Sequence, residues 1–473
     1  MFQAHRSPIP PAEAPRLLQG PPVSRMPNTQ STTRGWSVGQ LGKAAVMIAA
    51  LALATGVATA QECTKYVSHE GSGRSATLER PARDIGNIAS DLEAGDVVCI
   101  TGGTFTGRAD AGADLIEVPV AIYGGYSPDF STRDPWGAHR TVFTGVRNSP
   151  NFSTDYRLTI NTTDTATKLM AARGEPTEHT VIVDGVIFDN GDRNYYAGGE
   201  QSKIIRLGTP GETPTPESGG LVIRTGITST IVVRNVIVMN TAPTQGAIAL
   251  FPGAGARVTV DNNVAVNNTG AGFHLGTGVA TSEPADMPSY SFTNNISVFN
   301  EKHDAFGTFG GAGVILESST VVEMTGNILA FNDNYGIDNA KRADDIIVVG
   351  NVITANAQAD YLEFDTKIGL DDLEDWAEYV AEGWDNVALE LDFAISPEWG
   401  ALYASRNVID RNAAEADVEA VNSWYNGVRS FFGWNLVGTD LDVDSGIWLP
   451  RIGIEDALAV AVRVDDAYGV IRP

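Results

Sequence analysis

The stretch NNVAVNNTGAGFHLG, from Asn262 to Gly276, decides how the chain folds. Its apolar residues do not follow helical spacing, and short β-branched runs stand between asparagines instead. Asparagine tolerates the left-handed backbone conformation and bonds nearby backbone groups through its amide. Such residues suit sharp corners, so the stretch predicts short strands that turn at asparagines.

The same pattern recurs along the chain. An asparagine followed by an apolar run begins at Asn235, Asn263, Asn295, Asn327, Asn351 and Asn407, with a weaker copy at Asn435. The first four steps are 28, 32, 32 and 24 residues, which are periods of a stacked repeat architecture. Because the runs are too short and too β-branched for helices, each copy predicts one coil of a right-handed parallel β-helix, an all-β solenoid. Stacking of the coils would align the repeat asparagines in a ladder.

Three other segments resemble secreted right-handed β-helix repeat proteins of the pectate-lyase-like superfamily. They are LEAGDVVCITGGTFTG at Leu92–Gly107, AIYGGYSPDFSTRDPWGAHRTVFTG at Ala121–Gly145, and DDAYGVIRP at the end of the chain. The resemblance implies the fold and export. It leaves the chemistry open, because this fold hosts lyases, hydrolases, epimerases and non-catalytic surface proteins.

The N-terminal region predicts export. Lys43 precedes a short apolar run that ends in small residues at Ala58–Ala60, the pattern of a secretory signal removed from the mature protein. Met26 is an alternative start. We therefore expect a secreted or periplasmic chain that begins at Gln61, has no membrane span after signal removal and is a monomer. Its two cysteines, Cys63 and Cys99, predict one disulfide and argue against a zinc site.

The net charge limits the classes of binding partner that we expect. The formal net charge is -26 over 473 residues, so the surface repels phosphate backbones and nucleic acid is not an expected partner. Anionic polymers are disfavoured as well, unless a cation bridges them or one face is locally basic.

We divide the chain into an N-terminal extension with signal (residues 1–60), a cap with the first coils (61–145) and the β-helix repeats (146–473). Apolar spacing within Pro81–Gly95 predicts a capping helix over the first coil. A second amphipathic pattern predicts a short helix inserted near residues 366–384, which either edges a substrate groove or pads the core.

Candidate site residues follow from the repeat. The positions eleven residues past Asn263, Asn295, Asn327 and Asn351 are His274, Phe306, Asp338 and Leu362. We expect them to stack in one column, about 4.8 Å apart per coil. Since strand side chains alternate between the two faces, His274 and Asp338 should point out of the coil, with Phe306 between them. The working face would lie over residues 246–364.

Loops beside this column supply the groups that a polysaccharide lyase needs, namely a cation for the uronate carboxylate, a base and an acid. The candidates for base and neutraliser are His274, Lys302, His303, Tyr335, Lys341 and Arg342. Carboxylates suited to Ca²⁺ are Asp304, Asp338 and Asp345. Residues predicted to bind substrate are Phe306, Tyr361 and Glu363.

The leading hypothesis is an exported protein that acts on polysaccharide as a Ca²⁺-assisted lyase. The first alternative is a non-catalytic cell-surface or extracellular-matrix protein that binds through its long face. A weaker alternative is a glycoside hydrolase with Asp338 paired to Asp304 or Glu363. The chain shows no Arg-x-Pro-x-x-Arg of pectate lyases and no Gly-His-Gly of polygalacturonases, which weakens the enzyme interpretation.

Overall fold

The structure is a computed structural model. It describes residues 62–108, 112–145, 156–163, 179–191, 219–226, 229–241, 243, 245–268, 270–279, 281–300, 310–341, 343, 345–354, 356, 358–368, 452–458 and 460. The predicted signal region and residues 369–384 of the predicted inserted helix lie outside these ranges. Residues 366–368, at the start of that predicted helix, form a strand.

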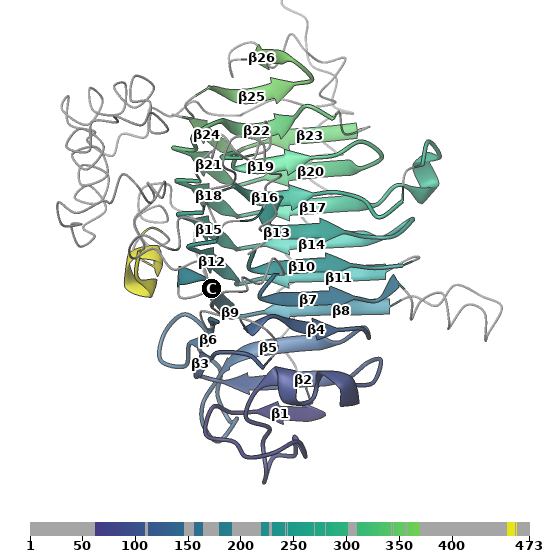
Figure 1. The fold of residues 1–473 in the computed structure, drawn as a ribbon. Coiled ribbons are helices and arrows are strands. Elements are labelled where there is room, and N and C mark those ends of the chain that lie inside the picture. The colour runs from purple at the N-terminus through teal and green to yellow at the C-terminus, as the bar shows by residue number, and fades with distance from the viewer. Residues whose placement is uncertain are drawn as a thin grey trace, which may run out of the picture. The chain divides into compact units, whose positions relative to one another are not determined.

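The described chain winds through three sheets, and Figure 1 shows the strands of successive coils lying one above another. Sheet A contains β1 (Lys65–Val67), β2 (Val97–Thr101), β5 (Ala121–Tyr126), β8 (His179–Asp184), β11 (Ser229–Arg234), β14 (Arg257–Asp261), β17 (Ser289–Thr293), β20 (Val321–Thr325) and β23 (Asp345–Val349). Sheet B contains β3 (Gly103–Phe105), β6 (Thr141–Phe143), β9 (Val186–Asp189), β12 (Ile237–Met239), β15 (Val264–Val266), β18 (Ile296–Val298), β21 (Ile328–Ala330) and β24 (Val352–Thr354). Sheet C contains β4 (Asp114–Ile116), β7 (Leu158–Asn161), β10 (Leu221–Arg224), β13 (Gly246–Phe251), β16 (Ala271–Leu275), β19 (Val314–Leu316), β22 (Tyr335–Asn339), β25 (Ala359–Glu363) and β26 (Thr366–Ile368).

Each strand pairs in parallel with the strand one coil away, which confirms the predicted parallel β-helix. Between β14 and β17, for example, Val258 lies opposite Tyr290 and Val260 opposite Phe292. Connections between parallel strands are right-handed almost without exception, which gives the helix its hand. Among the described strands, only β26 pairs antiparallel, with β25.

The core lies inside the coils and is built from inward-facing aliphatic and aromatic residues. On sheet C the row Ile248, Phe273, Val314, Ile337 and Tyr361 is fully buried in one continuous cluster. Residues between these positions point to the other face, so sheet C presents a regular outer surface.

The predicted asparagine ladder is confirmed. Asn263, Asn295, Asn327 and Asn351 are stacked in successive coils, and each Nδ2 donates to the next Oδ1 at 2.9, 3.1 and 2.7 Å. The same oxygens also accept backbone N–H groups, as Asn295 Oδ1 does from the N–H of Asn263. These amides therefore satisfy buried backbone groups at the corner between sheets A and B.

A second ladder stands at the next corner. It consists of Asn268, Asn300, Asn332 and Asn356, again linked from Nδ2 to Oδ1. Each of its members is the last asparagine of one of the repeats found in the sequence.

The left-handed conformation falls on the residue before the first ladder. Asn235, Asn262 and Asn294 have φ of 54°, 53° and 55°. Asn262 Nδ2 donates to Asn235 Oδ1, whereas the backbone N–H of Val236 donates to Asn263. Asn235 therefore aligns with Asn262, and the alignment of Asn235 with Asn263 was wrong by one residue.

The predicted capping helix is shorter than expected. Two single-turn 3₁₀ helices, η1 (Ile85–Asn87) and η2 (Ala89–Asp91), replace it. Its apolar residues still face the core, since Ile85 and Ile88 are buried. The Asp84 carboxylate accepts N–H groups from both Gly86 and Gly107, which holds the chain in tight turns rather than an α-helix. A further 3₁₀ turn, η4 (Pro284–Asp286), lies in the connection before β17.

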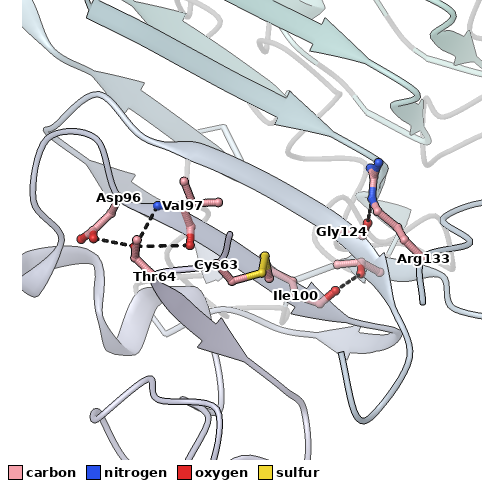
Figure 2. Close-up of a disulfide and its surroundings, with 9 residues drawn as sticks. Cys63, Thr64, Asp96, Val97, Ile100, Gly124 and Arg133 are labelled. Carbon is pink, nitrogen blue, oxygen red and sulfur yellow. Dashed lines mark hydrogen bonds between the residues drawn. A yellow bond between two sulfur atoms is a disulfide. The ribbon is translucent and has the colours of Figure 1, made fainter. Parts of the chain in front are cut away.

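The predicted disulfide joins Cys63 to Cys99 and ties the start of the described chain to β2, as Figure 2 shows. Next to it, Thr64 Oγ1 donates to Asp96 at 2.7 Å and accepts from the N–H of Val97 at 2.9 Å. These contacts extend the pairing of β1 with β2 beyond the strand end.

Residues 454–458 form a helical turn. Ile452, just before this turn, contacts a residue 212 positions earlier in the chain. Asn240 donates to the carbonyl of Ile452 at 3.0 Å and accepts from its N–H at 3.1 Å. Among the described residues, no helix is long and apolar enough to cross a membrane.

Candidate functional site

One column of outward-facing side chains runs along sheet C. In register order it consists of Val222, Ala249, His274, Ile315, Asp338 and Leu362. His274 and Asp338 thus lie two coils apart on the same face, as predicted. The residue between them is Ile315, so the prediction of Phe306 there was wrong, and Phe306 itself lies outside the described residues.

The reason for this error is the position of the extra residues within one coil. Ile315 follows Asn295 by twenty residues rather than eleven, because the extra residues of that coil fall between β18 and β19. Insertions between strands leave the register of the strands unchanged. A fixed count along the sequence therefore identifies the wrong neighbour in this coil, although the strands themselves remain paired in register.

His274 faces away from the core but is buried, with 3 % of its surface exposed. Its ring packs edge-on against Phe251, with centroids 5.1 Å apart. Its Nε2 lies 3.0 Å from Oε1 of Glu317, an ion-pair contact when the imidazole is protonated. Neither ring nitrogen has a hydrogen bond of good geometry, so the contact with Glu317 is electrostatic.

Glu317 follows β19 directly and was not among the predicted site residues. Its Oε1 accepts a hydrogen bond from Nζ of Lys341 and faces His274. Partial burial by itself would raise the pKa of Glu317, but these two basic groups outweigh it and lower the pKa to about 2. Only pairing of β16, β19 and β22 brings the three residues together, so no spacing in the sequence marks Glu317.

Asp338 lies on β22 and is 3 % exposed. Burial raises the pKa of this carboxyl to about 6, although a hydrogen bond from the N–H of Ala340 and the charge of Lys341 act in the opposite direction. Asp338 is therefore a carboxyl group that changes its protonation near neutral pH.

Tyr335 is the first residue of β22, and Lys341 lies shortly after the end of the same strand. The Lys341 side chain is 42 % exposed, so its ammonium is open to solvent where it bonds Glu317. Tyr335 packs on the outer cluster of Ala271, Ala312 and Ile315, and burial together with the charge of Asp338 raises the pKa of its hydroxyl.

Two predicted substrate contacts belong to the core instead. Tyr361 is fully buried in the inner row of sheet C, and its hydroxyl donates to Glu363 Oε2 at 2.9 Å. Asn339 Nδ2 donates to the same oxygen at 2.7 Å. Both side chains point inward because they alternate with Leu362 of the outer column, so their assignment to substrate was wrong.

The remaining predicted residues do not join this cluster. Asp345 is exposed at the start of β23 in sheet A, whereas Asp338 lies in sheet C. Outside the described residues are Lys302, His303, Asp304 and Arg342. Within the described ranges, no three His, Cys, Asp or Glu residues are grouped so that they could hold a metal ion.

We compared the chain with known proteins. No family model matches the sequence, and no curated protein matches it. Among solved structures, a crystal structure of pectate lyase Pel9A is similar, with a TM-score of 0.33 and 13 % identity over 66 % of this chain and 74 % of that one. The parallel β-helix is thus established here by the pairing of this chain's own strands.

Proposed function

We propose that the protein acts on a polysaccharide and cleaves glycosidic bonds with Glu317 and Asp338 as a carboxylate pair. The observation that carries the proposal concerns the pKa values of these two carboxyl groups, which lie on one face. Their surroundings lower the pKa of one and raise the pKa of the other. The pKa of Glu317 is about 2 and that of Asp338 is about 6. Two carboxyl groups whose pKa values are pushed apart are suited to the roles of base or nucleophile and of acid.

Placement of the two residues supports the same chemistry. Ile315 lies opposite Asp338, and Glu317 lies two residues further along the chain, directly after β19. Strand spacing and rise give a Cα separation of about 8 Å, from which side chains can reach both sides of one bond. Asp338 lies in β22 and Glu317 directly follows β19, so neighbouring strands of one stacked sheet position both residues, which favours a fixed geometry.

In this proposal Asp338 donates a proton to the leaving oxygen of the glycosidic bond. Glu317 stays ionised because Lys341 and His274 stabilise its negative charge. Lys341 also gives the site a positive group at its exposed side, which would attract a polar or anionic sugar despite the acidic chain.

Elimination is the second candidate, and the exposed ammonium of Lys341 favours it, since a lyase must neutralise a uronate carboxylate. Calcium assistance remains a proposal, for which Asp338 is the candidate ligand on this face among the described residues. No step of the mechanism above depends on the ion.

Export of the protein is part of the proposal. The Cys63–Cys99 disulfide supports it, because such bonds persist in oxidising compartments. The signal pattern before Gln61 supports it as well.

The test incubates the exported protein with a panel of neutral and acidic polysaccharides, with Ca²⁺ or with a chelator. New reducing ends without ultraviolet absorbance indicate hydrolysis, and absorbance of unsaturated ends indicates elimination. We expect reducing ends that disappear in Glu317→Gln and Asp338→Asn but persist in Asp345→Asn, which changes an exposed carboxylate on sheet A. A folded protein that is silent on the whole panel would favour the non-catalytic surface protein.

A further inference from the structure

The two oxygens of Glu317 have different surroundings. Oε1 accepts the hydrogen bond from Lys341 and lies 3.0 Å from His274 Nε2. Oε2 accepts no hydrogen bond from the described residues. Within the described part of the chain, one oxygen is therefore held by two basic groups and the other receives no hydrogen bond.

Gly276 lies directly beneath Oε2. A Cβ atom placed on Gly276 would lie 2.8 Å from Glu317 Oε2 and 2.7 Å from Cε1 of Phe251, closer than real Cβ contacts allow. The carboxylate and the ring edge can therefore lie this near to position 276 only because Gly276 has no side chain. The backbone of Gly276 is fixed from behind, since its carbonyl accepts from the hydroxyl of buried Tyr290 at 2.6 Å.

The imidazole that faces Oε1 is also held in place. His274 packs against Phe251, and the guanidinium of Arg224 lies 4.3 Å from the centroid of the Phe251 ring. Arg224, Phe251 and His274 come from three successive strands of sheet C. Packing of this kind fixes the position of a buried ring, so Nε2 stays directed at Glu317.

We propose that Oε2 of Glu317 is the oxygen that attacks the sugar, and that Gly276 is a positioning residue that admits it to this place. The inference rests on the proposed function, in which Glu317 is the ionised carboxylate. In the reaction, Oε2 forms a bond to the anomeric carbon, the bond from that carbon to the glycosidic oxygen breaks, and the proton of Asp338 passes to the leaving oxygen. Water then hydrolyses the glycosyl ester, so the product retains its configuration.

A carboxylate nucleophile of this kind can be labelled without any polysaccharide. The probe is glycidol, a small epoxide, whose ring opens when a carboxylate oxygen bonds to its terminal carbon and the epoxide oxygen takes a proton. Mass spectrometry of the digested protein locates the ester. We expect the wild-type protein to be labelled at Glu317 at least tenfold faster than at exposed carboxylates such as Glu323 and Asp345.

The decisive variant is Gly276→Ala. Gly276 does not have a positive φ, so alanine fits the backbone, and its Cβ displaces only side-chain atoms. We expect labelling of Glu317 to fall at least tenfold in a variant that still folds, with a lowered melting temperature because the added Cβ crowds buried Phe251. Thr277→Ala is the control, because among the described residues the Thr277 hydroxyl bonds only to Val279 and the variant should be labelled as the wild type is.

The outcomes separate this inference from the proposed function. Equal labelling of Glu317 and exposed carboxylates, or full labelling of Gly276→Ala, would overturn the inference even if polysaccharide is cleaved. Selective labelling that Gly276→Ala abolishes supports it even if every polysaccharide of the panel is left intact, and the proposed substrate class is then wrong. For a cleaved substrate, Gly276→Ala should lower kcat while KM changes little, and release of an inverted sugar would contradict attack by Oε2.

Discussion

At the scale of single residues, Asp338 couples the charge of the site to the stability of the fold. Its folded pKa of about 6 lies above the ordinary value of 3.8 because burial disfavours the charged form. Between about pH 4 and 6 the folded protein thus binds more protons than the unfolded chain, and the free energy of unfolding falls as the pH rises. A shift of about two units corresponds to about 3 kcal/mol.

We therefore predict that Asp338→Asn removes the part of the pH-dependent loss of stability that comes from ionisation of Asp338. The difference in the free energy of unfolding between the variant and the wild type should increase in favour of the variant from pH 4 to pH 8, by up to about 3 kcal/mol. Denaturant unfolding at each pH measures this difference. The amide introduced by this substitution retains an oxygen for the N–H of Ala340, so the turn stays intact. Asp345→Asn, on an exposed carboxylate, should show no such rise, and parallel stability curves for wild type and Asp338→Asn would refute the prediction.

Lys341 controls the charge of the second carboxyl group. Its ammonium bonds Glu317 Oε1, and with His274 it keeps the pKa of Glu317 at about 2. Lys341→Met removes one of these two basic groups, so the pKa of Glu317 should rise and activity should be lost at a higher pH on the acid side of the profile. The measurement is the pH dependence of kcat/KM, with Lys367→Met as control, since within the described ranges the Lys367 ammonium bonds only Gln358. An acid limb that does not move would show that Glu317 is not the group whose ionisation matters.

At the scale of elements, the asparagine ladder stabilises the corner between sheets A and B. Asn295 Oδ1 accepts from the N–H and the Nδ2 of Asn263, and its own Nδ2 donates to the carbonyl of Val260. Asn295→Ala leaves these buried groups without partners, which costs about 1–3 kcal/mol for each unsatisfied group. We predict a loss of about 3 kcal/mol or more in the free energy of unfolding, measured by denaturant titration.

The neighbouring position gives the matched comparison. Asn294 is exposed and has φ of 55°, so glycine replaces it without backbone strain. Of the side-chain hydrogen bonds that the described residues make, Asn294→Gly removes only the one from its Nδ2 to Asp261, and it should change stability by less than about 1 kcal/mol. Equal losses in Asn294→Gly and Asn295→Ala would contradict the separation of the two roles.

These corners explain which features the sequence could predict. Strand periodicity and repeated asparagines act within one coil, so the coil, the ladder and the outward direction of His274 follow from local pattern. Glu317 depends on pairing across coils of unequal length, and no local signal fixes that register. The burial of Glu363 was not predicted either. A carboxylate is stable in the core only where other side chains supply hydrogen bonds, as Asn339 and Tyr361 do here, and the sequence does not show that these residues meet.

At the scale of the whole molecule, the described part of residues 62–473 is a stack in which each strand pairs only with the coils on either side. In such a repeat structure, stability is close to a sum of coil and nearest-neighbour terms, so ends unfold separately from the middle. The site on β16, β19 and β22 lies many coils away from the N-terminal coil that carries the disulfide. Damage to that coil should therefore leave the site intact.

Reduction of Cys63–Cys99 tests this independence. The bond closes a loop across 36 positions of sequence, for which the chain-entropy treatment gives about 4 kcal/mol of stabilisation. In Cys63→Ala/Cys99→Ala, or after reduction, we expect hydrogen exchange to become faster in β1 and β2 and to stay unchanged in β14, β17 and β20. Cleavage of polysaccharide and labelling of Glu317 should persist, because neither residue of the pair touches the site. Faster exchange throughout the stack, together with loss of labelling, would mean that the coils unfold as one cooperative unit and that the N-terminal disulfide stabilises the site as well as the end of the helix.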